Sequence, residues 1–481
     1  MYIGIDLGST NIKAALYDRD MRLIDRSSCP VEYLRPQGFV EFDAEVYFEG
    51  LIELLRELLS ANSVTEVTEL SFTGQAESLV VLGADGRPLM NAISWMDERS
   101  VKECEELSRL FPPALCEAVT GQMAVLPTWP ATKILWLRHE RPEIYAAAKT
   151  YMLLKDYIIY RLTGRKMADM SIATFSFYFD IYEKRYWKEM LGAIGVREDQ
   201  LPPLTEPRTF AGELLPEFPQ RLQIRPGTRV NVGTLDHFAG MIGTGNIRPG
   251  SITLSTGTVM AMATLCPEPA PRSCGLAMHY GFLPDSYVQL PVAESGGVSL
   301  EWFHRNCCPQ LSLREIDEAA EARGMSQLIF LPYIVGTNAP EFDTNATGVF
   351  WGLRQEHDAV DMARAVMEGV AFVLRKNCEC LRGKGCAPES IIATGGGAKS
   401  RLWCQMQADI TGLPVRIPAE KEAACLGAAL CAATDAGRFP DLAAASAACV
   451  SFREEYLPRV NEAYERKYRR FVKLYDACLG V

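Results

Sequence analysis

The order of apolar and polar positions is the same in two separate parts of the chain. Residues 3–18 read IGIDLGSTNIKAALYD, and residues 252–265 read ITLSTGTVMAMATL. In each part a β-branched apolar run enters a short turn of Gly, Ser and Thr, and a second apolar run leaves it, which is typical of a β-hairpin. The pattern therefore predicts two hairpins of the same kind, one in each half of the chain.

Around these hairpins, apolar residues recur alternately at helical and at strand spacing. The predicted helices cover 46–59, 133–139, 153–162, 358–381 and 400–411, the last ending at Gly412. The predicted strands cover 68–72, 229–232 and 391–393. Strands that alternate with helices in both halves predict an α/β fold.

The length of the chain predicts two domains. A chain of 481 residues exceeds what a single hydrophobic core normally supports. Arg248, Pro249 and Gly250 form a turn signal directly before the second hairpin. We therefore expect an amino-terminal domain over 1–246 and a carboxyl-terminal domain over 247–481.

Composition and charge exclude several classes of protein. The net charge is −11 and basic residues gather only at 466–473, which argues against nucleic acid as a partner. The chain shows no leader pattern at its start, and no apolar run approaches the roughly 18 residues that span a bilayer. We expect a cytoplasmic protein without a membrane partner. A homodimer is compatible with the sequence.

Cysteine is frequent, with fifteen residues, but its spacing indicates no metal site. Cys378, Cys380 and Cys386 match no common zinc framework, and Cys425 and Cys431 lie in alanine-rich helical settings. The five histidines also lack ligand spacing. We expect reduced thiols in the protein core.

The turns of the two hairpins are candidate phosphate sites. Glycine lets a backbone approach a ligand closely, and the N–H groups and hydroxyls of such turns bind anions. Asp6 lies on the strand beside the first turn. A buried carboxylate there needs compensation, and a divalent cation held through water would supply it. The alternative is an aspartate that accepts N–H groups of its own turn.

Asp236 is the candidate general base. It follows a predicted strand, lies among small residues, and comes shortly before the second turn. Phosphoryl transfer to an alcohol needs one carboxylate that accepts the hydroxyl proton. The alternative is a helix N-cap for the segment that begins at Ala239.

Two further groups of residues have both a binding and a structural interpretation. Gly395, Gly396 and Gly397 between a strand and a helix would allow a flat ligand to approach, although such a run is also an ordinary loop. Polar side chains such as Gln75, Glu77 and Asp97 could bind the hydroxyls of a polyol, and Trp129 could stack on its carbon face. Asp97 and Arg99 could equally form a structural ion pair.

With these residues in place, the chain resembles the FGGY family of carbohydrate kinases over its whole length. Similar segments follow in colinear order from the first hairpin through ATKILWLRHERPEIY, LLKDYIIYRLTG, NVGTLDHFAG, FLPYIVG and ATGGGAKSRLW. The most specific match is GVFWGLRQEHDAVDMARAVME at 348–368, which fits the second family signature.

The resemblance implies an actin-like, hexokinase-type fold in which two ribonuclease-H-like domains enclose ATP and close over a sugar. It assigns Asp236 as the catalytic base, and Asp6 with Asp236 as the magnesium-associated carboxylates. The expected nucleotide-binding residues are Gly8, Ser9, Thr10, Lys13, Gly257, Thr258, Gly297, Glu301, Gly396, Gly397 and Arg401. The expected substrate-binding residues are Gln75, Ala76, Glu77, Asp97, Thr128, Trp129 and His237.

The segment that would select the sugar departs from the usual family patterns. Xylulose kinases usually have Gly-Gln-Met-His-Gly where residues 74–78 read Gly-Gln-Ala-Glu-Ser, and glycerol kinases usually have Asn-Gln-Arg-Glu-Thr. Glu77 is thus closer to the glycerol type, while Ala76 lacks a guanidinium. Residues 336–338 read Gly-Thr-Asn where the family usually has Gly-Glu-Arg.

These patterns predict an ATP-dependent, Mg²⁺-dependent kinase that phosphorylates a hydroxyl of a small ketose, a pentulose or hexulose. The alternative within the enzyme class is a kinase of a glycerol- or erythritol-like polyol. The alternative outside it is a sugar-sensing, actin-like regulator, which would be expected to lack its base, whereas Asp236 is present.

Overall fold

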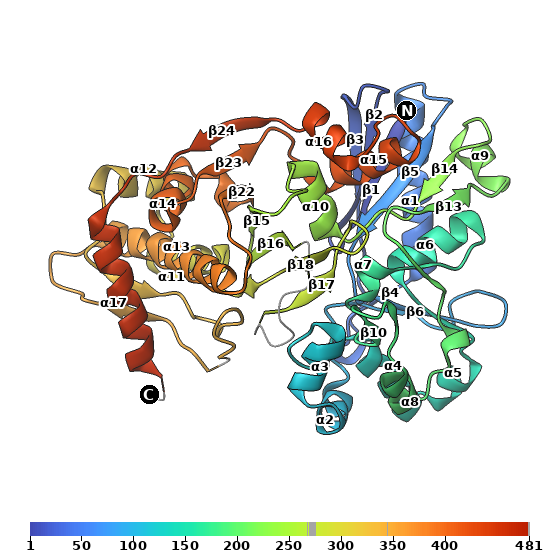
Figure 1. The fold of residues 1–481 in the computed structure, drawn as a ribbon, viewed down its shortest axis with the longest axis horizontal. Helices are drawn as coiled ribbons and strands as arrows, with labels where there is room; N and C mark the ends of the chain where they lie inside the picture. The colour runs from blue at the N-terminus through green and yellow to red at the C-terminus, as the bar shows by residue number, and fades with distance from the viewer. Residues whose placement is uncertain (267, 269–275, 344, 480–481) are drawn as a thin grey trace.

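The computed structural model describes residues 1–266, 268, 276–343 and 345–479. Two large β-sheets form the centres of two α/β parts of the molecule (Figure 1). The sheet of the first half and its helices occupy the right of that view, and the sheet of the second half lies to the left. This architecture confirms the predicted two-part α/β fold.

The sheet of the first half has six strands in the order β13-β14-β5-β1-β2-β3. Its strands are β1 (Tyr2–Leu7), β2 (Asn11–Tyr17), β3 (Leu23–Pro30), β5 (Glu69–Gly74), β13 (Phe210–Glu213) and β14 (Arg229–Asn231). Strands β1 and β2 are antiparallel, whereas β5 runs parallel to β1 and β14 parallel to β5. The carboxyl ends of β1, β5 and β14 therefore meet at one edge, where Asp6 lies near the end of β1 and Gln75 and Asp236 follow β5 and β14.

A smaller sheet and a group of helices extend the first half. The small sheet contains β4 (Glu41–Phe42), β7 (Ala92–Ile93), β6 (Leu79–Leu82) and β8 (Thr150–Leu153). The helices of this half include α1 (Ala44–Ala61), α2 (Val101–Leu110), α3 (Pro113–Thr120), α4 (Pro130–Glu140), α5 (Pro142–Ala147), α6 (Leu154–Thr163), α7 (Met170–Ala173), α8 (Lys188–Ile194) and α9 (Glu217–Leu222).

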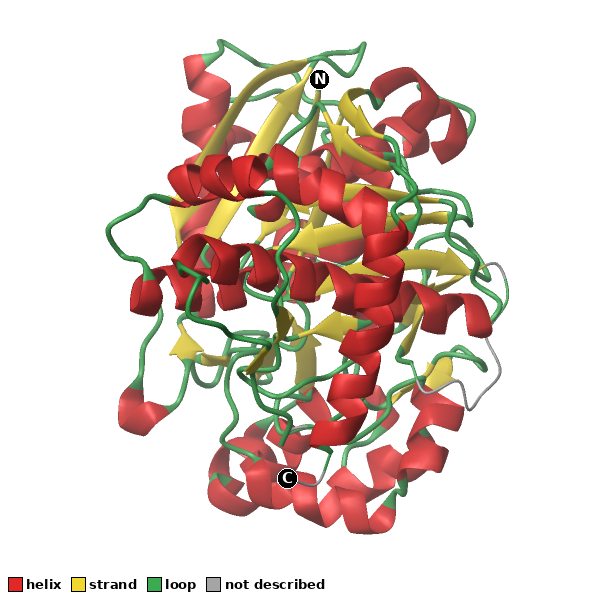
Figure 2. Cartoon of the chain, turned by 90° about the vertical axis from the view of Figure 1, so that its left-hand side faces the viewer, coloured by secondary structure: helices red, strands yellow, loops and turns green. Residues whose placement is uncertain are grey.

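The sheet of the second half repeats the arrangement of an antiparallel hairpin followed by parallel strands. Its main strands are β15 (Ser251–Thr256), β16 (Met260–Cys266), β17 (Met278–Tyr280), β18 (Tyr287–Gln289), β22 (Ser390–Gly395), β23 (Val415–Pro418) and β24 (Phe452–Tyr456). Strand β15 pairs antiparallel with β16 and parallel with β22. Figure 2, which looks onto this half, shows helices in front of the strands. These include α11 (Gly297–Cys307), α12 (Leu313–Arg323), α13 (Ala359–Gly383), α14 (Arg401–Thr411) and α17 (Glu462–Cys478).

Two helices cross between the halves. Helix α15 (Ala423–Asp435) comes late in the sequence but packs on β1, as Figure 1 shows, and α16 (Leu442–Cys449) packs against α15. A Cβ at Gly4 of β1 would lie 1.8 Å from the Cys425 carbonyl oxygen. Helix α10 (Asp236–Thr244) packs against α15 at the same closeness, since a Cβ at Gly427 would lie 1.8 Å from the Ala239 carbonyl oxygen. The expected boundary at 246/247 stays a prediction.

The predicted elements agree with the observed ones to within a few residues. The helix predicted at 46–59 is α1, and Asp43 caps its amino end by accepting N–H groups of Glu45 and Val46. The helix predicted at 400–411 is α14, which Ser400 caps and Gly412 ends at φ 72°. Both predicted hairpins are confirmed as β1–β2 and β15–β16.

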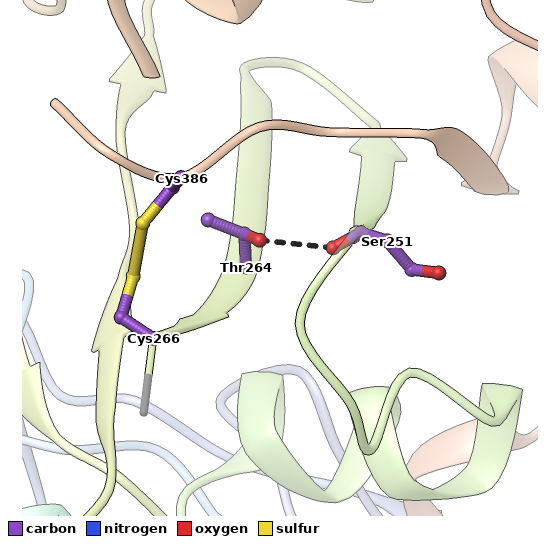
Figure 3. The surroundings of a disulfide bond; sticks show 4 residues. All are labelled: Ser251, Thr264, Cys266 and Cys386. Carbon is purple, nitrogen blue, oxygen red and sulfur yellow. Dashed lines mark hydrogen bonds between the residues drawn. A yellow bond between two sulfur atoms is a disulfide. The ribbon is translucent and has the colours of Figure 1, made fainter. Parts of the chain in front are cut away.

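One pair of cysteines differs from the expected reduced thiols. Cys266, at the end of β16, forms a disulfide with Cys386 in the connection between α13 and β22 (Figure 3). Nearby, the Thr264 hydroxyl donates to the Ser251 carbonyl oxygen at 3.0 Å. The sequence could not reveal this pair, because its members are 120 residues apart and no local spacing connects them.

Candidate active site

The first hairpin turn lies at the carboxyl ends of β1 and β5. Its Gly8, Ser9 and Thr10 are at least partly accessible, and the Tyr47 hydroxyl and the Gln75 amide both donate to the Gly8 carbonyl, at 3.0 and 3.3 Å. These two bonds fix the turn to α1 and to the end of β5. The N–H groups of the turn are thus held beside Asp6.

Asp6 carries an uncompensated oxygen atom. Its Oδ1 is buried and makes no hydrogen bond within the described part of the chain. Burial, and secondly the charge of Asp236, raise the pKa of Asp6 to about 7. Two carboxylates that disfavour each other's charge and include an unsatisfied oxygen form a site that a hydrated divalent cation fits.

Asp236 begins helix α10 directly after the turn that follows β14. Gly233 in this turn has φ 64°, and a Cβ there would lie 1.7 Å from the Phe72 carbonyl oxygen, so only glycine fits. Leu235, not Asp236, occupies the N-cap position, and Asp236 Oδ1 accepts the N–H of the adjacent His237 at 2.6 Å. The cap alternative therefore does not account for Asp236.

The second hairpin turn borders a cavity of about 660 Å³. Gly257 and Thr258 lie on its wall, and the turn also holds helix α11, because Gly297 N–H donates to the Gly257 carbonyl at 2.7 Å. The wall includes six residues expected to bind the nucleotide: Gly257, Thr258, Gly297, Glu301, Gly396 and Gly397. Leu300, Leu313, Met367 and Trp403 give the same cavity an apolar side. Glycine-rich turns at one side and an apolar slot at the other suit a nucleotide.

Five residues expected at the nucleotide do not line this cavity, namely Gly8, Ser9 and Thr10 of the first hairpin turn, Lys13 and Arg401. Arg401 does not line the cavity: its side chain is 83% exposed and its Nε lies 3.6 Å from Glu454. Lys13 lies opposite Asp6 on β2 and forms an ion pair with Glu422 at 2.8 Å. Lys13 thereby joins the first hairpin to the amino end of α15.

Gln75, Ala76 and Glu77 form the loop after β5, on the other side of Asp6. Ser78 donates to the Gln75 side chain at 2.8 Å and accepts the Trp95 N–H at 3.0 Å. Glu77 has φ 64°, an uncommon conformation for glutamate. Burial raises the pKa of the Glu77 carboxyl, whereas the Lys133 ammonium and a hydrogen bond from Thr128 act in the opposite direction. Glu77 and Thr128 are thus brought together as expected.

Lys133 also lies beside this loop, although it was not among the residues expected from the sequence. It is fully buried on α4, and its ammonium donates to the carbonyl oxygens of Ser94 and Glu77 at 2.8 and 3.1 Å. The available signal was a lysine inside an otherwise apolar helical face, in the segment ATKILW. Such a lysine needs buried acceptors.

Aromatic rings close the site between the two halves. Trp129, 4% exposed, stacks on Phe177 with centroids 5.7 Å apart, and its indole N–H donates to Ala124. Phe175 lies between Trp129 and His279 of β17, at 6.0 and 4.5 Å. Trp129 is therefore mainly a packed wall of the site.

His279 completes this wall from the second half of the chain. Its Nδ1 lies 3.1 Å from the Gln122 amide nitrogen. Burial, and secondly the charge of His237, lower its pKa to about 3. One site is thus surrounded by residues from both halves of the chain: Asp6, Gln75, Glu77, Trp129, His237, Asp236 and His279.

Asp97 is occupied by structural contacts. Arg99 binds both of its carboxylate oxygens, at 2.7 and 2.8 Å, and the Val40 N–H donates to Oδ2 at 2.5 Å. The Arg99 side chain is 1% exposed, bonds Glu41 as well, and lies over the Phe39 ring at 4.1 Å. This geometry is the structural ion pair that the sequence left open, so Asp97 is not carried into the proposed sugar site.

Family models match both halves of the chain. The amino-terminal domain of the FGGY family of carbohydrate kinases matches residues 1–243, and its carboxyl-terminal domain matches residues 251–436. The chain belongs to the FGGY family of carbohydrate kinases. It is therefore a sugar kinase, a phosphotransferase with an alcohol group as acceptor.

Relatives of this FGGY kinase carry more than one substrate name. Xylulose kinase of Bacillus subtilis is 29% identical, with 98% of this chain and 95% of the relative covered. Xylulose kinase of Escherichia coli is 32% identical, with 86% and 85% covered. Gluconokinase of Bacillus licheniformis is 26% identical, with 98% and 94% covered. The substrate does not follow from these names.

Solved structures confirm the fold of this FGGY kinase. Xylulose kinase of Lactobacillus acidophilus superposes with a TM-score of 0.92 at 26% identity, covering 100% of this chain and 98% of that one. Glycerol kinase of Plasmodium falciparum superposes at 0.91 with 21% identity, 99% and 98% covered, and supports the fold alone. Among the described residues, no helix is long and apolar enough to cross a bilayer.

Proposed function

We propose that this kinase transfers the γ-phosphoryl group of ATP to a hydroxyl of a small, uncharged ketose, a pentulose or hexulose. The observation that carries the proposal is that Asp236 lies near the Asp6 carboxylate, while the adjacent His237 lies near His279 of the aromatic wall. A sugar hydroxyl placed there faces a carboxylate that can accept its proton.

The residues of the site divide the work of the reaction. Asp236 accepts the hydroxyl proton as the new phosphate ester bond forms and the bond to ADP breaks. The turns at Gly8 and Gly257 offer N–H groups to the phosphates from the two halves. Mg²⁺, which Asp6 and Asp236 would hold through water, neutralises phosphate charge when bound. The aromatic wall excludes water from the acceptor side.

The charges on the sugar side favour a neutral sugar over a sugar acid. Glu77 and Asp236 present carboxyl groups to this region. Two cations lie nearby, but Lys133 is engaged by the Ser94 and Glu77 carbonyls, and Arg99 by Asp97 and Glu41. Both of these cations are already engaged, so a gluconate-like carboxylate would meet the like charge of Glu77 and Asp236, which is costly in a buried site.

A polyol is the second candidate substrate. The observation that favours it is Glu77, whose carboxyl is positioned by Thr128 at the place where a hydroxyl chain would lie. Carboxylates bind vicinal hydroxyls in either substrate class, so the choice between ketose and polyol rests on measured selectivity.

A substrate panel in a coupled ADP-release assay tests the proposal. We expect the largest kcat/KM with a pentulose or hexulose, lower values with glycerol and erythritol, and none with gluconate. Glu77→Gln should lower kcat/KM for the preferred sugar by about 10- to 100-fold, as expected for loss of a charge-assisted hydrogen bond. Glu368→Gln removes another buried carboxylate, one that binds Arg364 and Lys467 and lies outside the sugar side of the site, and it serves as the control. Turnover of gluconate above the neutral sugars would contradict the proposal.

A further inference from the structure

A buried network connects the turn before Asp236 to two helices, α6 and α7, that do not belong to the proposed site. Its members are Lys155 of α6, Asp169 and Ser171 around α7, and Thr234 and Leu235 of the turn. The side chains of Lys155, Asp169, Ser171 and Thr234 are inaccessible to solvent. Such a network is costly unless each polar group has a partner.

Ser171 is the junction of this network. Its hydroxyl donates to Asp169 Oδ2 at 2.8 Å and accepts both the Leu235 N–H at 3.1 Å and the Thr234 hydroxyl at 2.9 Å. A serine hydroxyl has one proton and two lone pairs, so all of its bonding capacity is used. Leu235 directly precedes Asp236, and its N–H is therefore fixed in space by Ser171.

Asp169 and Lys155 make further contacts that fix Ser171 and the turn. Asp169 accepts the Ser171 N–H at 2.9 Å through its other oxygen and pairs with the Lys155 ammonium at 2.6 Å. The same ammonium donates to the Val232 carbonyl at 2.5 Å. The turn is thus bound at both of its ends, at Val232 by Lys155 and at Leu235 by Ser171.

We propose that Ser171, held by Asp169 and Lys155, is a positioning residue for the catalytic base: it fixes the amino end of α10 so that Asp236 faces the acceptor hydroxyl. The inference rests on the proposed function, in which Asp236 is that base. Ser171 touches neither substrate nor nucleotide in this account. Its effect is confined to the placement of the carboxylate.

The positioning role predicts a loss of turnover without a loss of nucleotide affinity. Displacing a reacting group by about 1 Å costs about 100-fold in rate. We expect Ser171→Ala to lower kcat by about 10- to 100-fold, with ATP affinity unchanged. Thr234→Val, which removes the hydroxyl at constant shape, should lower kcat as well. Thr234→Ser, which keeps the hydroxyl, should retain the wild-type kcat.

The chain offers a matched control in the second half. Ser326 is 3% exposed, donates to the Asp361 carbonyl at 2.9 Å and accepts the Leu328 N–H at 3.1 Å. Ser326→Ala removes a buried hydroxyl of the same type far along the chain from Asp236. It should lower the melting temperature as Ser171→Ala does, yet leave kcat unchanged.

The experiment measures kcat, ATP affinity and amide hydrogen exchange of residues 232–238 in the full-length protein and these variants. Faster exchange at Leu235 and a kcat loss in Ser171→Ala and Thr234→Val, but not in Ser326→Ala or Thr234→Ser, support the inference. Equal kcat losses in Ser171→Ala and Ser326→Ala, or unchanged exchange at Leu235, overturn it. If Ser171→Ala does not fold, the Thr234 pair decides. If the wild-type protein is inactive on every sugar, the proposed function is contradicted instead. The hydrogen exchange at Leu235 then still tests whether Ser171 fixes the amino end of α10.

Discussion

Helices α10 and α15 meet so closely that one added methyl group should separate them. A Cβ at Gly243 would lie 1.9 Å from the Ala423 carbonyl oxygen and 2.9 Å from the Gly427 nitrogen. Carbon and oxygen atoms without a bond rarely approach closer than about 3 Å, so Gly243→Ala must move the helices apart by about 1 Å. Because both partners are backbone atoms, no side chain can rotate to make room.

This displacement should lower both stability and turnover. Overpacking of a core costs about 1–3 kcal/mol, and α10 carries Asp236 at its first position. A shift of about 1 Å at the base costs about 100-fold in kcat. We therefore expect Gly243→Ala to unfold at lower denaturant concentration and to turn over sugar far more slowly.

The same helix supplies the control. Gly240 of α10 has open space where its Cβ would lie, and Gly240→Ala should stabilise the protein by about 0.5–1 kcal/mol through helix propensity. Chemical unfolding followed by circular dichroism and a steady-state kinase assay measure both effects. A Gly243→Ala variant as stable and active as Gly240→Ala would refute the close-packing argument.

Two further predictions concern pH and the nucleotide cavity. The pKa of His279 is lowered to about 3, so below about pH 6.5 the unfolded chain binds a proton there that the folded chain does not. Stability should fall as the pH falls from about 6.5 toward 3, by about 2 kcal/mol at pH 5, and unfolding curves of His279→Gln should lack this component. An equal pH slope in both proteins would contradict the neutral histidine. Leu313, 45% exposed on the cavity wall, can be changed to Glu at little cost in stability, and Leu313→Glu should weaken ATP binding about tenfold in calorimetry. Unchanged affinity would contradict the placement of the nucleotide against the apolar side of this cavity.

Much of the fold and part of the site could be predicted from local sequence patterns. Alternating apolar runs around Gly8 and Gly257 specify the two hairpins, because strand period and turn chemistry are local properties. The position of Asp236, after a strand and before a phosphate-type turn, could be predicted for the same reason, since it too depends on neighbouring residues in the sequence. Thr128, in contrast, is a candidate only through the family resemblance.

The remaining features depend on contacts between distant segments. The packing of α15 on β1 requires the carboxyl-terminal half of the chain to return to the first sheet. The spacing of apolar residues cannot predict this, because it is a local property of the sequence. Burial of Lys133, Lys155 and Lys467 is equally hidden, since a lysine on a helix normally faces solvent. Lys467 of α17, for example, is 7% exposed and binds Glu368.

The central claim is that Asp236 is the proton acceptor of a sugar kinase whose two hairpin turns bind ATP. Asp236→Asn keeps the shape of the side chain and removes its basicity. The most direct test measures sugar phosphorylation and ATP affinity of this variant beside the wild type. We expect nearly intact ATP binding with most of the turnover lost. Phosphorylation of the preferred sugar by Asp236→Asn at the wild-type rate would contradict it.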